Sequence, residues 1–188
     1  MKRYKLFLRY LCAFIMFSSF FNSNTSYAGS FYDLSFKSID GNNVNLSEFE
    51  DKVVFIVNTA SFCGFTNQFK GIQEISERYE SRGLVVIGFP SNDFGQEANS
   101  PNEVKKICTL NYDVNFLMAD ISSVTGNKAH PLFNFLKLNL GERSVPKWNF
   151  YKYIIGRDGV PINWFSSITK PTNKKIITSI ELALAQQL

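Results

Sequence analysis

The sequence predicts an α/β domain in which a central mixed β-sheet carries helices on both faces, preceded by an N-terminal β-hairpin. Residues 53–57 (VVFIV) and 84–89 (LVVIGF) are continuous apolar runs, typical of strands buried on both faces. Residues 66–82 place apolar side chains at helical spacing. Near the C-terminus, residues 156–159 (GRDG) predict a turn between two further strands. Strands that alternate with helices and then end in a hairpin favour a mixed sheet.

The N-terminal half supports this prediction element by element. Residues 31–48 alternate weakly around the turn signal DGNN at 40–43, which predicts the hairpin. In the predicted helix over 66–82, Gly83 is the stop signal. The apolar side chains at helical spacing are Phe69, Ile72, Ile75 and Tyr79.

The C-terminal half begins with Ser100-Pro101-Asn102-Glu103, a capping box with proline at the first helical position. It predicts a helix that extends to about Tyr112. The remaining expected elements are a strand over 116–121, a helix over 131–140, strands over 151–155 and 160–165, and a helix over 172–187. This order matches a thioredoxin-like fold with extra elements inserted.

Residues 1–28 are predicted to be a cleavable signal peptide. A basic start (Lys2, Arg3, Lys5, Arg9) precedes an apolar run and then Ser26-Tyr27-Ala28, with small residues where a signal peptidase cleaves. The run is short for a membrane span, which takes about 20 residues. We therefore expect cleavage after Ala28 and a periplasmic or secreted domain over 29–188. The alternative is an uncleaved N-terminal anchor.

Without this leader the chain is nearly neutral. The leader holds four of the 20 basic residues and no acidic ones, which leaves 16 basic residues against 16 acidic. No concentrated basic face is expected, so nucleic acid is not a predicted partner. A domain of about 160 residues buries enough surface to fold without a disulfide. Cys63 and Cys108 are therefore free for chemistry, although a plain structural disulfide is the alternative in an oxidising compartment.

Cys63 lies between a predicted buried strand and the start of a helix. Unpaired backbone N–H groups at such a position stabilise a thiolate, which is the nucleophilic form. The alternative is an inert buried cysteine. A disulfide reductase with a Cys-x-x-Cys motif is disfavoured, because Thr66 stands where the second cysteine would be.

Three segments resemble the motifs of glutathione peroxidases. Residues 58–66 (NTASFCGFT) resemble the family's NVAS-x-CG-x-T, residues 89–97 (FPSNDFGQE) resemble FPCNQFG-x-QEP, and residues 148–150 match WNF. They occur in family order, over residues 31–188. The resemblance implies a thiol peroxidase that reduces hydrogen peroxide and organic or lipid hydroperoxides. The second and third motifs disfavour a peroxiredoxin or another thioredoxin-fold oxidoreductase.

The resemblance also implies a catalytic tetrad of Cys63, Gln96, Trp148 and Asn149. The two amides and the indole N–H are uncharged donors that can hold a thiolate or a departing oxygen. Asn92, Gly95 and Glu97 are expected to be scaffold. One residue that is usual between FG and QE is absent, and Ala98 replaces the usual proline. This shortening leaves open whether Gln96 keeps the family position.

The segment around Cys108, residues 106–109 (KICT), resembles the resolving-cysteine segment of the family's thioredoxin-using branch. In that branch the sulfenic acid condenses with a second cysteine to a disulfide. In this chain, a disulfide between Cys63 and Cys108 would require local unwinding of the helix that carries Cys108. The alternative is that Cys108 is a semi-buried helix cysteine without a redox role. Cys108 favours a thioredoxin-like donor over glutathione. A second candidate function is a peroxide sensor that passes oxidation to a partner protein through the same cysteines.

The remaining motifs predict no further chemistry. His130, the one histidine, precedes Pro131 at a helix start and is expected to be structural. No residue spacing indicates a metal site and no glycine-rich loop indicates a nucleotide, so no cofactor is expected. The link from Pro131 to Trp148 is short. It lacks the long loop of tetrameric, glutathione-specific members, which predicts a monomer or weak dimer with an accessible site.

Overall fold

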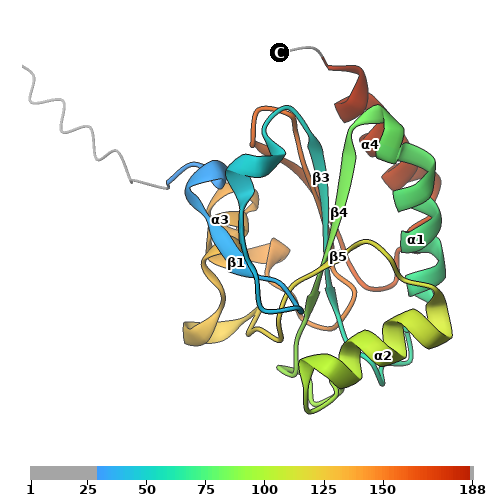
Figure 1. Cartoon of the computed structure of the whole chain (residues 1–188). Helices are drawn as coiled ribbons and strands as arrows, with labels where there is room; N and C mark the ends of the chain where they lie inside the picture. The colour runs from blue at the N-terminus through green and yellow to red at the C-terminus, as the bar shows by residue number, and fades with distance from the viewer. Residues whose placement is uncertain (1–28, 187–188) are drawn as a thin grey trace, which may run out of the picture.

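In the computed structural model, residues 29–186 are described, and the predicted signal peptide over 1–28 lies outside them. A five-stranded sheet forms the centre (Figure 1), in the order β5-β4-β3-β6-β7. Pairing is parallel between β3, β4 and β5 and antiparallel between β3, β6 and β7. The predicted mixed sheet is therefore confirmed. Its strands are β3 (Val53–Thr59), β4 (Leu84–Pro90), β5 (Leu117–Met118), β6 (Lys152–Ile155) and β7 (Pro161–Phe165).

Helices cover both faces of this sheet. In Figure 1, α1 and α4 lie on one side of the strands, α3 lies on the other, and α2 crosses the lower end. Two hydrophobic clusters follow this division, one with side chains from α1, α2 and α4 and the other with side chains from α3. The bounds are α1 (Gln68–Tyr79), α2 (Pro101–Tyr112), α3 (Pro131–Leu140) and α4 (Lys174–Ala185).

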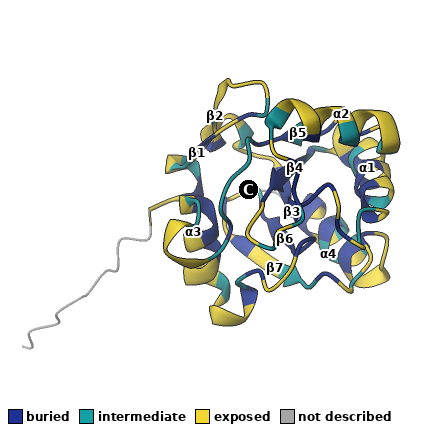
Figure 2. Ribbon diagram, turned by 90° about the horizontal axis from the view of Figure 1, so that it is seen from below, coloured by how far each residue is buried: buried dark blue, intermediate teal, exposed yellow. Residues whose placement is uncertain are grey.

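Strand β3 is the centre of the core, and all seven of its residues are buried. Successive side chains of a strand point to opposite faces. Val53, Phe55 and Val57 accordingly join the cluster under α1 and α4, and Val54 and Ile56 join the one under α3. Figure 2 shows the buried strands enclosed by helices whose outer faces are exposed. The continuous apolar run is explained by burial on both sides.

The N-terminal hairpin is present as β1 (Ser35–Lys37) paired antiparallel with β2 (Asn43–Asn45). Several predicted bounds differ from the structure by one to three residues, and two of these differences have a clear cause. Strand β5 ends at Met118 because the chain then turns to the hairpin: Ala119 N still donates to Gly88 O of β4 at 2.8 Å, but Asp120 N donates to Lys37 O at 2.7 Å. Helix α1 begins two residues late because residues 64–67 form turns, beginning with the bond from Thr66 N to Cys63 O at 3.1 Å.

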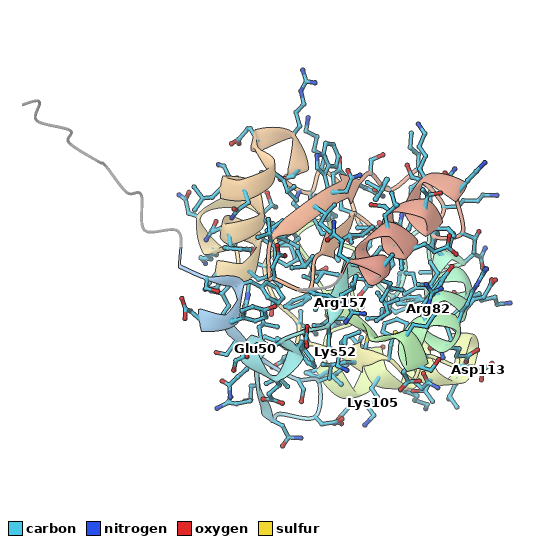
Figure 3. The ribbon with its side chains drawn as sticks, turned by 90° about the horizontal axis from the view of Figure 1, so that it is seen from above. Glu50, Lys52, Arg82, Lys105, Asp113 and Arg157 are labelled. Atoms are coloured by element: carbon cyan, nitrogen blue, oxygen red, sulfur yellow. The ribbon has the colours of Figure 1, made fainter. Side chains whose placement is uncertain are left out.

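Arg157, in the turn between β6 and β7, ties together the end of the sheet where β3 begins (Figure 3). Its guanidinium donates to the carbonyls of Asp51, Arg82 and Leu184. Because Arg157 fills the end of the sheet where β3 begins, the loops that can form a site lie at the opposite end, after the carboxyl ends of β3 and β4. Within residues 29–186, none of the helices has the length and apolarity needed to span a membrane.

Candidate active site

Cys63 lies in the loop that joins the carboxyl end of β3 to α1. Its side chain is only 4% exposed, and the backbone N–H of Phe65 points to Sγ at an N···S distance of 3.5 Å. Neighbouring Phe62 is 59% exposed. The predicted position between a buried strand and a helix is confirmed, and a buried cysteine there directly follows an exposed aromatic residue in the chain.

Asn58, near the end of β3, attaches the segment over 148–151 to this loop. Its carbonyl accepts from Phe150 N at 2.7 Å, its Oδ1 accepts from Tyr151 N at 2.8 Å, and its Nδ2 donates to Trp148 O at 3.2 Å. Phe150 has a positive φ of 65°, which is costly for a residue with a side chain. The bonds to Asn58 help to hold that conformation, which turns the chain at Asn149.

Gln96 lies on the loop that follows β4. Its backbone carbonyl accepts from Phe62 N at 2.9 Å, and its Oε1 accepts from Asn149 Nδ2 at 3.0 Å. Asp93 anchors this loop, because its carboxylate accepts from Val124 N at 2.7 Å and from Thr125 N at 3.0 Å. The shortened loop therefore still brings Gln96 to Asn149.

The buried Glu97 side chain connects the loop that follows β4 to the loop that carries Cys63. It is 7% exposed, and its Oε1 accepts from Ser61 N at 2.9 Å and from Ala98 N at 2.8 Å. Burial raises the pKa of this carboxyl, and the bonds from Ser61 and Ala98 oppose the rise. Asn92 Oδ1 accepts from Glu97 N at 3.2 Å. These contacts agree with the scaffold role expected for Asn92 and Glu97.

The four predicted site residues thus gather at one end of the sheet, although not all are in contact. Gln96 and Asn149 are hydrogen-bonded, and Asn149 is fully buried. Trp148 is 40% exposed, with its ring 5.5 Å from that of Phe94. Among the described residues, the hydrogen bond to Cys63 Sγ comes from Phe65 N and not from the three predicted donors.

Cys108 is on α2 and is 2% exposed. It lines a cavity of about 380 Å³ between α2 and the N-terminal hairpin, with Ser38, Val44 and Thr109 among its other lining residues. Burial, with a smaller contribution from the Glu97 carboxylate, raises the pKa of the Cys108 thiol to about 12. Cys63 and Cys108 are both free thiols and belong to the same hydrophobic cluster. In this state Cys108 is a protonated, weakly nucleophilic thiol.

His130 caps α3, as expected for a structural residue. Its Nδ1 accepts from Leu132 N at 3.2 Å, and burial lowers its pKa, so the neutral ring is favoured. Across residues 29–186 there is no group of three or more His, Cys, Asp or Glu side chains placed to hold a metal ion. Sequence reasoning missed the anchoring roles of Asn58 and Asp93. A polar residue inside the apolar run of β3 was the available signal for Asn58.

Known proteins resemble the chain in sequence. A family model described as glutathione peroxidase matches residues 31–137. A glutathione peroxidase from Lactococcus lactis is 45% identical over 76% of this chain and 92% of its own length. A hydroperoxy fatty acid reductase from Synechocystis is 41% identical over 74% of this chain and 88% of its own.

Solved structures resemble it in fold. The crystal structure of Trgpx in apo form has a TM-score of 0.69 at 36% identity, over 85% of this chain and 97% of that one. A thioredoxin-family thiol:disulfide interchange protein from Chlorobium tepidum has a TM-score of 0.59 at 15% identity, over 81% and 93%, which indicates the fold alone. The predicted thioredoxin-like fold is confirmed. With the motifs, the fold and these relatives in agreement, the chain belongs to the glutathione peroxidase family and is a thiol-dependent peroxidase.

Proposed function

We propose that Cys63 is the residue that attacks the peroxide. The Cys63 thiolate attacks one oxygen of R–O–O–H, the O–O bond breaks, the sulfur becomes a sulfenic acid, and the departing oxygen takes a proton to leave as alcohol or water. The observation that carries this proposal is the position of the hydrogen-bonded amides of Gln96 and Asn149 beside the Cys63 loop. These amides and the Trp148 indole are the proposed donors to the reacting atoms.

Lipid hydroperoxides are proposed substrates beside hydrogen peroxide. Phe62, next to Cys63, is 59% exposed, and Trp148 is 40% exposed. Exposed aromatic side chains that neighbour Cys63 and Asn149 in the chain suit a bulky apolar peroxide, because they offer apolar surface to bury. The relative named hydroperoxy fatty acid reductase supports this substrate class. A monomer or weak dimer would keep the entrance open.

Cys108 is the proposed resolving residue. Its sulfur attacks the sulfur of the Cys63 sulfenic acid, a disulfide forms, and water leaves. A dithiol of the thioredoxin type then returns both cysteines to thiols and is itself oxidised. The buried thiol, with its pKa raised to about 12, has to be exposed first. Opening of α2 would return its pKa towards about 8.5 and make it reactive.

The decisive experiment counts free thiols before and after one equivalent of peroxide, and then measures turnover with thioredoxin and glutathione offered separately. In the reduced domain over 29–188, both Cys63 and Cys108 should lose their thiols, Cys63→Ser should lose peroxide reduction, and Cys108→Ser should keep the first oxidation. Near-normal reduction by Cys63→Ser would overturn the proposal. A disulfide present before peroxide is added would indicate a structural bond. A stable mixed disulfide with a partner, without turnover, would favour the sensor function.

Export is a separate proposal. It rests on the basic, apolar and small-residue order of positions 1–28. Intact mass of the protein from its producing cell should correspond to a chain that begins at Gly29. Recovery of the full-length chain from the cytosol would contradict it.

A further inference from the structure

Lys152 on β6 is a fully buried lysine that the proposed reaction does not use. Its Nζ donates to Thr169 O at 2.7 Å and lies 3.5 Å from Ser166 O. Within the described part of the chain, the two ion pairs are Lys105–Asp40 and Lys137–Glu142, so no carboxylate compensates this amine. Burying a lysine in this way costs stability, and an apolar side chain would fill the same space more favourably.

The carbonyls that Lys152 holds belong to the loop between β7 and α4. Ser167, between them, is buried and makes two bonds to the active-site end of the molecule. Its Oγ donates to Asn149 O at 2.6 Å, and its own carbonyl accepts from Gln68 Nε2 at 2.7 Å. Gln68 is the first residue of α1, five positions after Cys63. The loop thus connects both segments that carry predicted site residues.

The same loop shapes the surface beside the site. Together with the start of α1 it encloses a cavity of about 520 Å³, whose lining includes Gly64, Phe65, Ile168 and Pro171. Gly64 directly follows Cys63. A shift of residues 166–169 would therefore change both the support of Asn149 and the wall of this cavity.

We propose that Lys152 is a positioning residue of the peroxidase: it fixes the loop over 166–169 so that Ser167 bonds Asn149 and Gln68 at the same time. This inference rests on the proposed role of Cys63 as the attacking residue. An amine can donate to two carbonyls at once from one point in the core. Ser166 O also accepts from Thr169 N at 3.1 Å, so an apolar side chain would leave the Thr169 carbonyl unpaired and the loop free to shift. Because reacting groups must be held closely in place, a small shift of Asn149 slows the reaction.

The test compares Lys152→Met, Ser167→Ala and the double variant in the full chain, with Lys175→Met as the control. Lys175 is an exposed lysine on α4. The rate constant for oxidation of Cys63 by hydrogen peroxide is measured in a single turnover, and stability is measured by urea unfolding. We expect the rate constant of each single variant to fall about tenfold or more. The rate constant of the double variant should fall no further than that of the slower single variant, because each of these variants breaks the same network. The control should keep the wild-type rate.

Two results would overturn the proposal. One is a wild-type rate for Lys152→Met or Ser167→Ala. The other is a loss of rate by Lys152→Met that is accompanied by a lower unfolding midpoint and adds to the loss from Ser167→Ala, as a merely structural role predicts. If Lys152→Met fails to fold, the rate of Ser167→Ala decides alone. Cys63→Ser, run in parallel, separates the outcomes: activity in that variant contradicts the proposed function itself.

Discussion

Replacing Lys152 by methionine should make the protein more stable at low pH and should change how its stability depends on pH. Burial lowers the pKa of Lys152 from 10.5 to about 7. Between these two values the unfolded chain binds the proton and the folded chain does not, so the free energy of unfolding of the wild type rises with pH across this window. Below about pH 7 the whole penalty is present, and the 3.5-unit difference corresponds to about 5 kcal/mol.

The methionine variant removes this penalty but leaves the carbonyl of Thr169 unpaired, at a cost of about 2 kcal/mol. It should therefore be about 3 kcal/mol more stable than the wild type at pH 6. By pH 9 the remaining penalty of the wild type is about 2 kcal/mol, and the two proteins should be nearly equal. The other titratable groups are the same in both proteins, so their titration cancels in the difference.

Urea unfolding at several pH values from 6 to 9, followed by the fluorescence of Trp148 and Trp164, measures this difference. The slope of the free energy against urea must stay the same in both proteins for the comparison to hold. A stability difference that does not change with pH would refute the reasoning, because it would show that Lys152 keeps one charge state in both the folded and the unfolded chain.

Three further predictions concern the site. Glu97→Ala should lower the free energy of unfolding by about 2–4 kcal/mol, because the buried N–H groups of Ser61 and Ala98 lose their acceptor. Glu97→Gln keeps an acceptor, so its free energy of unfolding should fall less. Urea unfolding of both variants checks this. Gln96→Ala should slow the first oxidation of Cys63 about 100-fold with little loss of stability, as measured by stopped-flow, and an unchanged rate would mean that Gln96 does not face the reacting atoms. Cys108→Ser should leave that first oxidation intact and lose turnover with a dithiol donor, as measured by steady-state peroxide consumption; normal turnover would exclude its resolving role.

The elements that the sequence predicted best are those with local signals. Helix α2 extends from Pro101 to Tyr112, as expected from its cap, and Ser100 Oγ accepts from Glu103 N at 3.3 Å. Gly83 stops the α1 region with a φ of 93°. Strand β5 was predicted too long because its end is decided by bonds to the hairpin about 80 residues earlier in the chain, such as that from Asp120 to Lys37. Such long-range bonds have no local sequence signal.

The site residues likewise divide into those with a local sequence signal and those placed by long-range bonds. The motifs identified Gln96 and Asn149, but only the fold reveals that their amides are hydrogen-bonded. Lys152 had a visible signal, since it is a charged residue at the start of an otherwise apolar strand. Its partners had none, because the carbonyls of Ser166 and Thr169 are backbone atoms that any residue supplies. A buried lysine can thus be suspected from the sequence, whereas its purpose can be argued only from the structure.

The proposed order of the two cysteine reactions agrees with the surroundings of each cysteine. Cys63 lies in a loop next to exposed Phe62, whereas Cys108 is a buried residue of α2 whose thiol pKa is raised to about 12. Helix α2 buries only Val104 and Cys108, while α1 buries six residues and α3 and α4 bury four each. The exposed ion pair between Lys105 of α2 and Asp40 stabilises the packed position of this helix by at most about 1 kcal/mol. Because α2 buries the fewest residues of the four helices, it is the helix expected to open at the lowest cost. Under the proposed mechanism, the Cys108 thiol therefore reacts only after the peroxide has oxidised Cys63.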